Sequence, residues 1–264
     1  MTDNGRIVAR HEIRTPVLAI AAAVLYQVLV WFAWYPLAGY DDTTLLVAQI
    51  GFAALAIVLL LSLRLHTEHL GLGGFDLLLA LAGIALAYGL LLAAVLIANA
   101  LGGQLQVFRP SYHPYAILDN WLLTGLGEEL FFAGVLFNLV RKRVRRPWLG
   151  VLLTAAAFAL WHLPGYLAVG LHTGQLGAGI LFDLMLNLLS WGFFGAIYLF
   201  SGNLWLTALA HASTDYGLLP AITNVPALGL LFMSMVVAVA WWLGRRSKYP
   251  HEASAVGAHR VSPR

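Results

Sequence analysis

Residues 120–140 read NWLLTGLGEELFFAGVLFNLV, a stretch of 21 residues whose only ionisable side chains are Glu128 and Glu129. About 20 predominantly apolar residues suffice for an α-helix to cross roughly 30 Å of hydrocarbon. A charged side chain at the centre of such a helix costs about 3 kcal/mol even on the gentler insertion scales, so it indicates function. The stretch therefore predicts a transmembrane helix that carries a functional acidic pair.

The composition of the whole chain points to the same class of protein. Of its 264 residues, 61% are hydrophobic and 10% are charged, with a mean hydropathy of +0.81. A soluble domain carries about 25% charged residues, so a soluble globule is excluded. The chain has no Cys, which excludes disulfides, a thiol nucleophile and Cys-ligated metal centres. The sequence thus predicts an integral, multi-pass membrane protein, in the inner membrane if the source is bacterial.

Apolar runs long enough to span a bilayer recur along the chain. They are Val17 to Pro36, Thr44 to Leu63, Leu77 to Leu101, Asn120 to Val140, Trp148 to His162, Ile180 to Phe200, Asn203 to Leu219 and Val225 to Leu243. The polar segments between them include Gly102 to Asp119 and the Gly-rich stretch Pro164 to Gly179, both expected to be loops. The predicted fold is all-α, a polytopic bundle of about eight transmembrane helices.

Basic residues set the expected orientation of this bundle. If the N-terminus is cytoplasmic, 14 of the 15 Lys and Arg residues fall on the cytoplasmic side, and Arg109 is the exception. This is the bias that the positive-inside rule describes, so both termini are expected to be cytoplasmic. Contact with anionic lipid headgroups explains the net charge of +3, and no nucleic-acid partner is needed.

Three regions are expected along the chain. Residues 1–14 form a polar cytoplasmic leader, residues 15–246 form a single transmembrane domain, and residues 247–264 form a disordered cytoplasmic tail.

Ionisable side chains within the predicted helices gather at one depth. At a rise of about 1.5 Å per residue, Glu128, His162, His211 and Asp215 share a band about 9 Å thick near the middle of the membrane. Asp183 lies near a predicted helix start, where a carboxylate favours the helix dipole, so a structural role is preferred for it. Asn187 is expected to form interhelical hydrogen bonds. The shared depth of the other residues indicates a common site.

Residue spacing adds detail to this site. His211 and Asp215 are four residues apart and project from one helix face. Glu128 and Glu129 are adjacent and point about 100° apart, so only one of them can face a reacting centre directly. The other is expected to orient a neighbouring group.

Three short motifs in this region resemble those of a known family. Glu128 to Gly134 resembles the motif EExxxR followed by Gly, Phe158 to His162 resembles FxxxH, and His211 to Asp215 resembles HxxxN/D. Together, in this order, they resemble the CPBP family of intramembrane proteases, which includes type II CAAX prenyl endopeptidases and bacteriocin-processing or immunity relatives. The motif core lies within residues 120–220. The family pattern has Arg where this chain has Ala133.

The resemblance implies an intramembrane endopeptidase acting on a membrane-associated or CAAX-like peptide or protein. Glu128 would activate a water that His162 helps to bind. His211 and Asp215 would polarise the scissile carbonyl and its oxyanion, with Glu129 in support. A divalent metal such as zinc stays open, because two His and a carboxylate form a zinc-type ligand set but no HExxH helix is present.

Two other functions remain open on the sequence. Chains of Glu, His and Asp also serve proton relays and proton-coupled transporters, although no internal repeat of the kind common in transporters is visible. A catalytically silent immunity or scaffold member of the same family is the other alternative, supported by the missing Arg.

Overall fold

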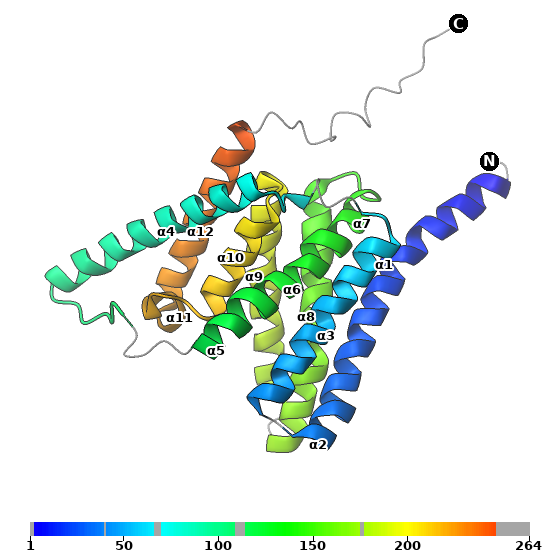
Figure 1. Cartoon of the computed structure of the whole chain (residues 1–264), viewed down its shortest axis with the longest axis horizontal. Helices are drawn as coiled ribbons and strands as arrows, with labels where there is room; N and C mark the ends of the chain where they lie inside the picture. The colour runs from blue at the N-terminus through cyan, green and yellow to red at the C-terminus, as the bar shows by residue number, and fades with distance from the viewer. Residues whose placement is uncertain (1–2, 40, 66–69, 109–113, 175–176, 247–264) are drawn as a thin grey trace, which may run out of the picture.

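The computed structural model describes residues 3–39, 41–65, 70–108, 114–174 and 177–246, with side chains from Thr15 to Arg245. These residues form helices and connecting turns, with no strand among them, so the predicted all-α class is confirmed. Figure 1 shows the helices gathered into a bundle, with α4 projecting at one edge beside α12. The predicted tail, residues 247–264, lies outside the described residues.

Seven helical segments in the described part of the chain are long and apolar enough to cross a membrane. The first combines α1 (Asp3–Leu29), η1 (Val30–Trp34) and α2 (Tyr35–Ala38), and the next two are α3 (Asp42–Ser62) and α4 (Gly74–Ala100). The fourth combines α5 (Pro114–Ile117), η3 (Leu118–Thr124), α6 (Gly125–Glu129), η4 (Leu130–Phe137) and α7 (Asn138–Arg141). The others are α8 (Pro147–Thr173), α9 (Ala178–Ser201) and α12 (Pro226–Arg246). Together with their apolar surfaces, these helices make the chain an integral, multi-pass membrane protein.

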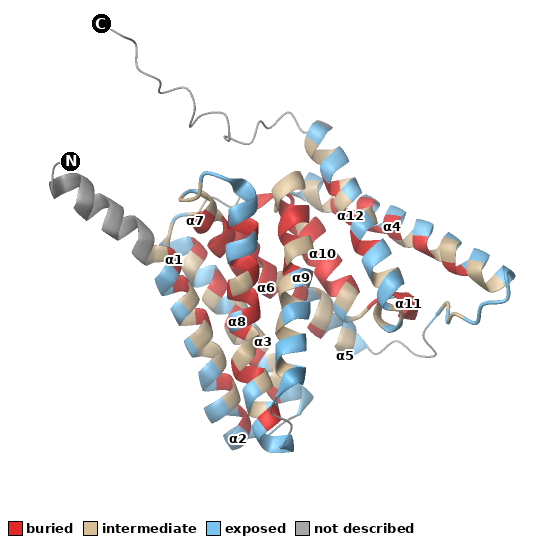
Figure 2. Cartoon of the chain, turned by 180° about the vertical axis from the view of Figure 1, so that it is seen from behind, coloured by how far each residue is buried: buried red, intermediate tan, exposed pale blue. Residues whose placement is uncertain are grey.

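The segment from α5 to α7 lies at the centre of the bundle. It is the most buried of the seven, and Figure 2 shows buried residues concentrated in α6 and α10. It starts six residues earlier than expected, at Pro114 in place of Asn120, because the helix extends into a segment predicted as a loop. Proline suits the first helical turn, where its missing N–H would have no partner in any case.

The seventh predicted helix is shorter than expected. α10 covers Leu204–Asp215, and its 12 residues are about 18 Å long, too short to cross the hydrocarbon alone. The chain continues through a non-helical stretch into α11 (Pro220–Asn224). Irregular backbone is tolerated at membrane depth where protein covers it and supplies hydrogen bonds. Here Trp121 Nε1 donates to the Tyr216 carbonyl at 3.0 Å, and the Leu218 N–H donates to the Tyr88 hydroxyl at 3.2 Å.

The expected loop from Pro164 to Gly179 is wrong for most of its length. α8 continues to Thr173 and ends where Gly174 adopts a left-handed conformation with φ of 72°. Pro164 cannot donate to the Leu160 carbonyl, a loss that usually kinks or ends a helix in water. Neighbouring helices compensate for such a proline in a membrane bundle. This extension matters for function because it places Gly165 and Tyr166 beside His162.

Both ends of the described chain lie at the same end of the bundle. In Figure 1, α1 starts, α7 ends and α12 ends at the upper side. The basic residues at the end of α7 and directly after it, from Arg141 to Arg146, therefore lie on the side from which α1 enters the bundle. That this side is cytoplasmic stays a prediction from the positive-inside rule.

Candidate active site

Four of the five candidate residues form one cluster where α6 meets α10. His211 lies at its centre, with Nδ1 2.9 Å from Glu129 Oε1 and Nε2 3.4 Å from Asp215 Oδ2. The same Nε2 lies 3.9 Å from Glu128 Oε2. Glu128, Glu129 and His211 are each at most 4% exposed, whereas the side chain of Asp215 is 33% exposed. Three carboxylates thus surround one buried imidazole, and Asp215 forms the accessible edge of the cluster.

The two adjacent glutamates have different surroundings. Glu129 is fully buried, and its Oε1 accepts the hydrogen bond from His211 Nδ1. Glu128 lines a cavity, and its Oε2 is buried without a hydrogen-bond partner among the described residues. The roughly 100° between adjacent helix positions accounts for this divergence. Glu129 therefore fixes His211, while Glu128 keeps lone pairs free for a water molecule or a substrate.

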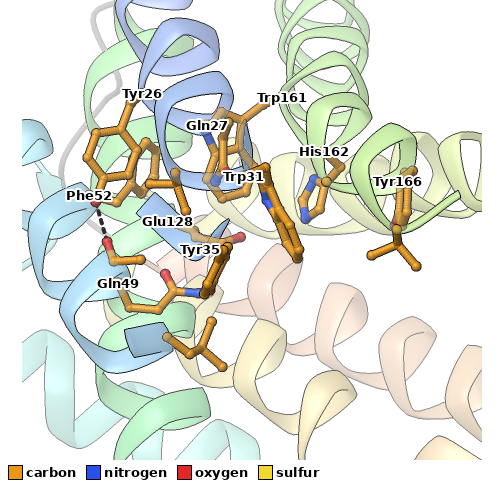
Figure 3. A pocket seen from close by; sticks show the side chains of 15 residues that line it. Tyr26, Gln27, Trp31, Tyr35, Gln49, Phe52, Glu128, Trp161, His162 and Tyr166 are labelled. Atoms are coloured by element: carbon orange, nitrogen blue, oxygen red, sulfur yellow. Dashed lines mark hydrogen bonds between the residues drawn. The ribbon is translucent and has the colours of Figure 1, made fainter. Parts of the chain in front are cut away.

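His162, on α8, faces the same cavity as Glu128. The cavity has a volume of about 210 Å³ and lies between α1, α3, α6 and α8. Figure 3 shows the His162 ring and the Glu128 carboxylate pointing into it. The Phe158 carbonyl lies 3.0 Å from His162 Nδ1, and a carbonyl only accepts, so Nδ1 carries the proton. A neutral His162 therefore has an unprotonated Nε2 with which it accepts a hydrogen bond.

Aromatic side chains hold both imidazoles in place. Phe194 stacks on His211 with ring centroids 4.4 Å apart, and Phe158 packs against His162 at 4.5 Å. Phe158 also contacts His211 edge-on at 5.8 Å, so one ring separates the two histidines. This apolar enclosure keeps bulk water from the imidazoles and strengthens the electrostatic interactions among the buried groups.

The helices that carry these residues depart from regular α geometry close to the site. The π-helical segment η4 starts directly after Glu129, and η1 supplies Trp31, a residue of the cavity wall. π-Helical turns frequently occur at functional sites because the extra residue redirects neighbouring side chains.

The arrangement can support acid–base chemistry on a bound molecule. A carboxylate with free lone pairs in a largely apolar cavity can remove a proton from water, and a nearby imidazole can hold that water. Glu129 holds His211 through Nδ1, and the other ring nitrogen of His211, Nε2, lies 3.9 Å from Glu128 Oε2. The residues thus offer a base and a water ligand in one cavity, with an oriented imidazole beside the base.

A resident metal fits this arrangement poorly. Within the described part of the chain, no group of three His, Asp or Glu side chains has an arrangement that could hold a metal ion. Catalytic zinc sites use three protein ligands. His162 Nδ1 is engaged by a backbone carbonyl and His211 Nδ1 by Glu129, so each ring has only its Nε2 left as a possible ligand. The side chains of the chain can supply acid–base chemistry at this site by themselves.

Three other residues considered in the sequence lie outside the cavity: Asn187, Asp183 and Ala133. Asn187 donates to the Tyr166 hydroxyl at 2.5 Å and so links α9 to α8, which confirms its interhelical role. Asp183, in the second turn of α9, does not line the cavity. Ala133 is fully buried in the apolar core, where an arginine would require a partner for its charge.

Sequence reasoning missed several residues near the site. Gln27 and Gln49 line the cavity, but they are not ionisable and were therefore not among the predicted site residues. The signal that could have identified them is an amide side chain in the middle of an apolar run. Asp119, in a segment predicted as a loop, is buried in η3, and its Oδ1 lacks a hydrogen-bond partner among the described residues.

Comparison with known protein families agrees with the motif resemblance. Residues 110–217 match the family model described as type II CAAX prenyl endopeptidase Rce1-like. The match covers less than half of the chain and includes all five candidate residues. No curated protein and no solved structure gives a match.

Proposed function

Residues 110–217 carry an Rce1-like type II CAAX prenyl endopeptidase domain, consistent with the CPBP family, and on this premise we propose that the protein is an intramembrane endopeptidase that uses a glutamate-activated water. The observation that carries the proposal is the Glu128 carboxylate. It is 3% exposed, one of its oxygens lacks a hydrogen-bond partner among the described residues, and it lines a cavity shared with His162. Buried polar groups are normally satisfied, so such an oxygen indicates a binding position for water or substrate.

Glu128 acts as the general base in this proposal. Its carboxylate removes a proton from a water that also donates a hydrogen bond to His162 Nε2. The resulting hydroxide adds to the carbonyl carbon of the scissile peptide bond. The protonated Glu128 then transfers that proton to the nitrogen of the leaving amine as the C–N bond breaks, which balances the reaction.

His211 stabilises the oxyanion of the tetrahedral intermediate. As an imidazolium it donates Nδ1–H to Glu129 and Nε2–H to the oxyanion. The carboxylates of Glu129 and Asp215, 2.9 and 3.4 Å from its ring nitrogens, favour this charged form. Preorganised donors in a site that excludes water commonly make the largest contribution to rate. Glu129 is a positioning residue, whereas His211 contacts the reacting atoms.

The proposed substrates are membrane-associated peptides or proteins. The family description names CAAX prenyl endopeptidases, and the cavity lies among helices that span the membrane. A suitable panel has two reporters: a quenched fluorescent peptide with an isoprenylated Cys near its C-terminus, and an unlipidated transmembrane peptide.

The decisive experiment compares Glu128→Gln with the parent protein in proteoliposomes. The substitution retains the shape of the side chain and removes the base, so cleavage of the reporters should fall about 10²- to 10⁴-fold. Asp183→Asn, which removes a carboxylate outside the cavity, is the matched control and should cleave like the parent. His162→Ala should also lose activity.

Cleavage by Glu128→Gln at the rate of the parent would refute the proposal. No cleavage of either reporter, together with proton flux that is lost in His211→Ala, would support the proton relay instead.

A further inference from the structure

Two glutamines, one on α1 and one on α3, lie within membrane-spanning helices and line the same cavity as Glu128 and His162. Gln27 is near the middle of the spanning segment Thr15–Ala38, and Gln49 is eight residues into α3, which starts at Asp42. They are the only amide side chains in these two segments. Figure 3 shows both among the side chains that line the cavity.

Neither amide is used by the fold. In the described part of the chain, no hydrogen bond connects Gln27 or Gln49 to another group, although both are partly buried. Their neighbours are engaged elsewhere; the Tyr26 hydroxyl, for example, donates to the Ala48 carbonyl at 2.5 Å. Neither amide belongs to the buried side-chain groups without a partner, so both are open to a hydrogen bond from a molecule in the cavity. Two such amides on one cavity wall indicate a ligand that supplies their partners.

We propose that Gln27 and Gln49 bind the main chain of the substrate as an extended segment and align its scissile carbonyl with Glu128 and His162. This inference rests on the proposed endopeptidase function and adds the form in which the substrate is recognised.

A peptide main chain is the ligand that best matches these two side chains. Each Gln offers two N–H donors and one carbonyl acceptor, the same types of group that a peptide presents in pairs. A peptide bond must leave helical conformation to be hydrolysed, and its N–H and C=O groups then need partners at membrane depth. Amides can supply them without adding a charge to the cavity.

The remaining cavity wall suits apolar substrate side chains. Its aromatic members come from α1, η1, α2, α3 and α8: Tyr26, Trp31, Tyr35, Phe52, Trp161 and Tyr166. Such a wall accepts aliphatic or aromatic side chains without requiring a particular one. The geometry therefore points to an extended apolar peptide held by its backbone.

The test uses Gln27→Met and Gln49→Met, which retain side-chain length and remove the amide. Each variant should raise KM for the cleaved reporter about 3- to 10-fold with a smaller change in kcat, the effect of losing one or two net hydrogen bonds. Thr154→Val is the matched control. It removes a buried hydroxyl on α8 that has no partner among the described residues and does not line the cavity, so KM should not change.

A second measurement separates main-chain recognition from a structural role. Replacing single amides of the reporter by esters removes one substrate N–H donor at a time. At the position contacted by a glutamine, the ester should weaken binding to the parent yet have no further effect on the matching Met variant. Gln27→Asn and Gln49→Asn, which retain the amide with a shorter reach, replace any Met variant that does not fold.

Binding measured in the Glu128→Gln background keeps this inference separate from the catalytic proposal. If the reporter binds there and the glutamine substitutions change neither affinity nor the ester effects, main-chain recognition is wrong whatever the chemistry. Equal losses for every ester in parent and variants would show that the glutamines act only through the fold, which would also overturn it. Loss of cleavage in Glu128→Gln with binding intact leaves the endopeptidase proposal standing in either case.

Discussion

Glu129 provides a way to separate the chemistry of the site from its stability. It is fully buried, and its Oε1 accepts the 2.9 Å hydrogen bond from His211 Nδ1. Glu129→Gln keeps an oxygen at the same place and removes the charge, whereas Glu129→Leu removes the acceptor. The predicted order of cleavage rates is therefore parent, then Glu129→Gln, then Glu129→Leu.

The size of each effect follows from the two oxygens of the carboxylate. Glu129→Leu leaves the buried His211 Nδ1–H without its acceptor, at a cost of about 1–3 kcal/mol. The same substitution removes Oε2, which is buried with no partner among the described residues, and this relieves a penalty of similar size. Thermal stability should therefore change little. Cleavage should fall about 10²-fold or more, because His211 loses the group that orients it.

The assay pairs initial rates on the reporter peptides with thermal unfolding of the same proteoliposome samples. Glu129→Leu with parental cleavage rates would show that His211 needs no orienting acceptor. A loss of rate that follows the loss of folded protein would show that Glu129 acts only through stability. Either result would refute the assigned role of Glu129.

Two further predictions concern the cavity wall and a helix cap. A Cβ at Gly165 would lie 2.9 Å from Trp31 Cε2 and Nε1, so Gly165→Ala should push the indole into the cavity and raise KM for the reporter peptides. Gly192→Ala is the control, because a Cβ there meets nothing within 4 Å. It should leave KM unchanged in the same kinetic assay. The Thr44 N–H donates to Asp41 Oδ1 at 2.7 Å at the start of α3, and this hydrogen bond holds the pKa of the Asp41 carboxyl below its usual value. A lowered pKa in the folded state means that the charged cap stabilises the fold above about pH 4, and that this stabilisation disappears as pH falls through the lowered pKa. Asp41→Asn keeps an acceptor without the charge, so its melting temperature should depend less on pH in that window than that of the parent; identical pH profiles would contradict the role of the cap.

The transmembrane architecture could be predicted because hydropathy acts locally. A run of about 20 apolar residues has few alternatives to a membrane helix, and the predicted runs coincide with the observed helices to within a few residues at most ends. The errors occur where tertiary contacts override local signals. α8 continues through Pro164, which a helix packed in a membrane bundle tolerates. α10 stops at Asp215, and the irregular chain that follows is held by hydrogen bonds from Trp121 and to Tyr88.

The candidate site, too, could be predicted from the sequence only in part. Ionisable residues in apolar runs pointed to Glu128, His162 and His211 without any structure, because the cost of burying a charge makes such residues rare. Their separate surroundings could not be read from the sequence. The fold alone places Glu129 against His211 and leaves Glu128 in the cavity.

The sequence by itself determined a helical membrane protein with titratable groups near mid-depth and a protease-like set of motifs, since each of these depends on residue type and spacing along one helix. Only the tertiary structure decided that Glu128 Oε2 lacks a hydrogen-bond partner among the described residues, and that Gln27 and Gln49 line the same cavity as Glu128. The physical reason is that a hydrogen bond or a cavity wall depends on contacts within a few ångströms between segments far apart in the chain, as between Glu129 and His211, 82 residues apart, which no local pattern encodes.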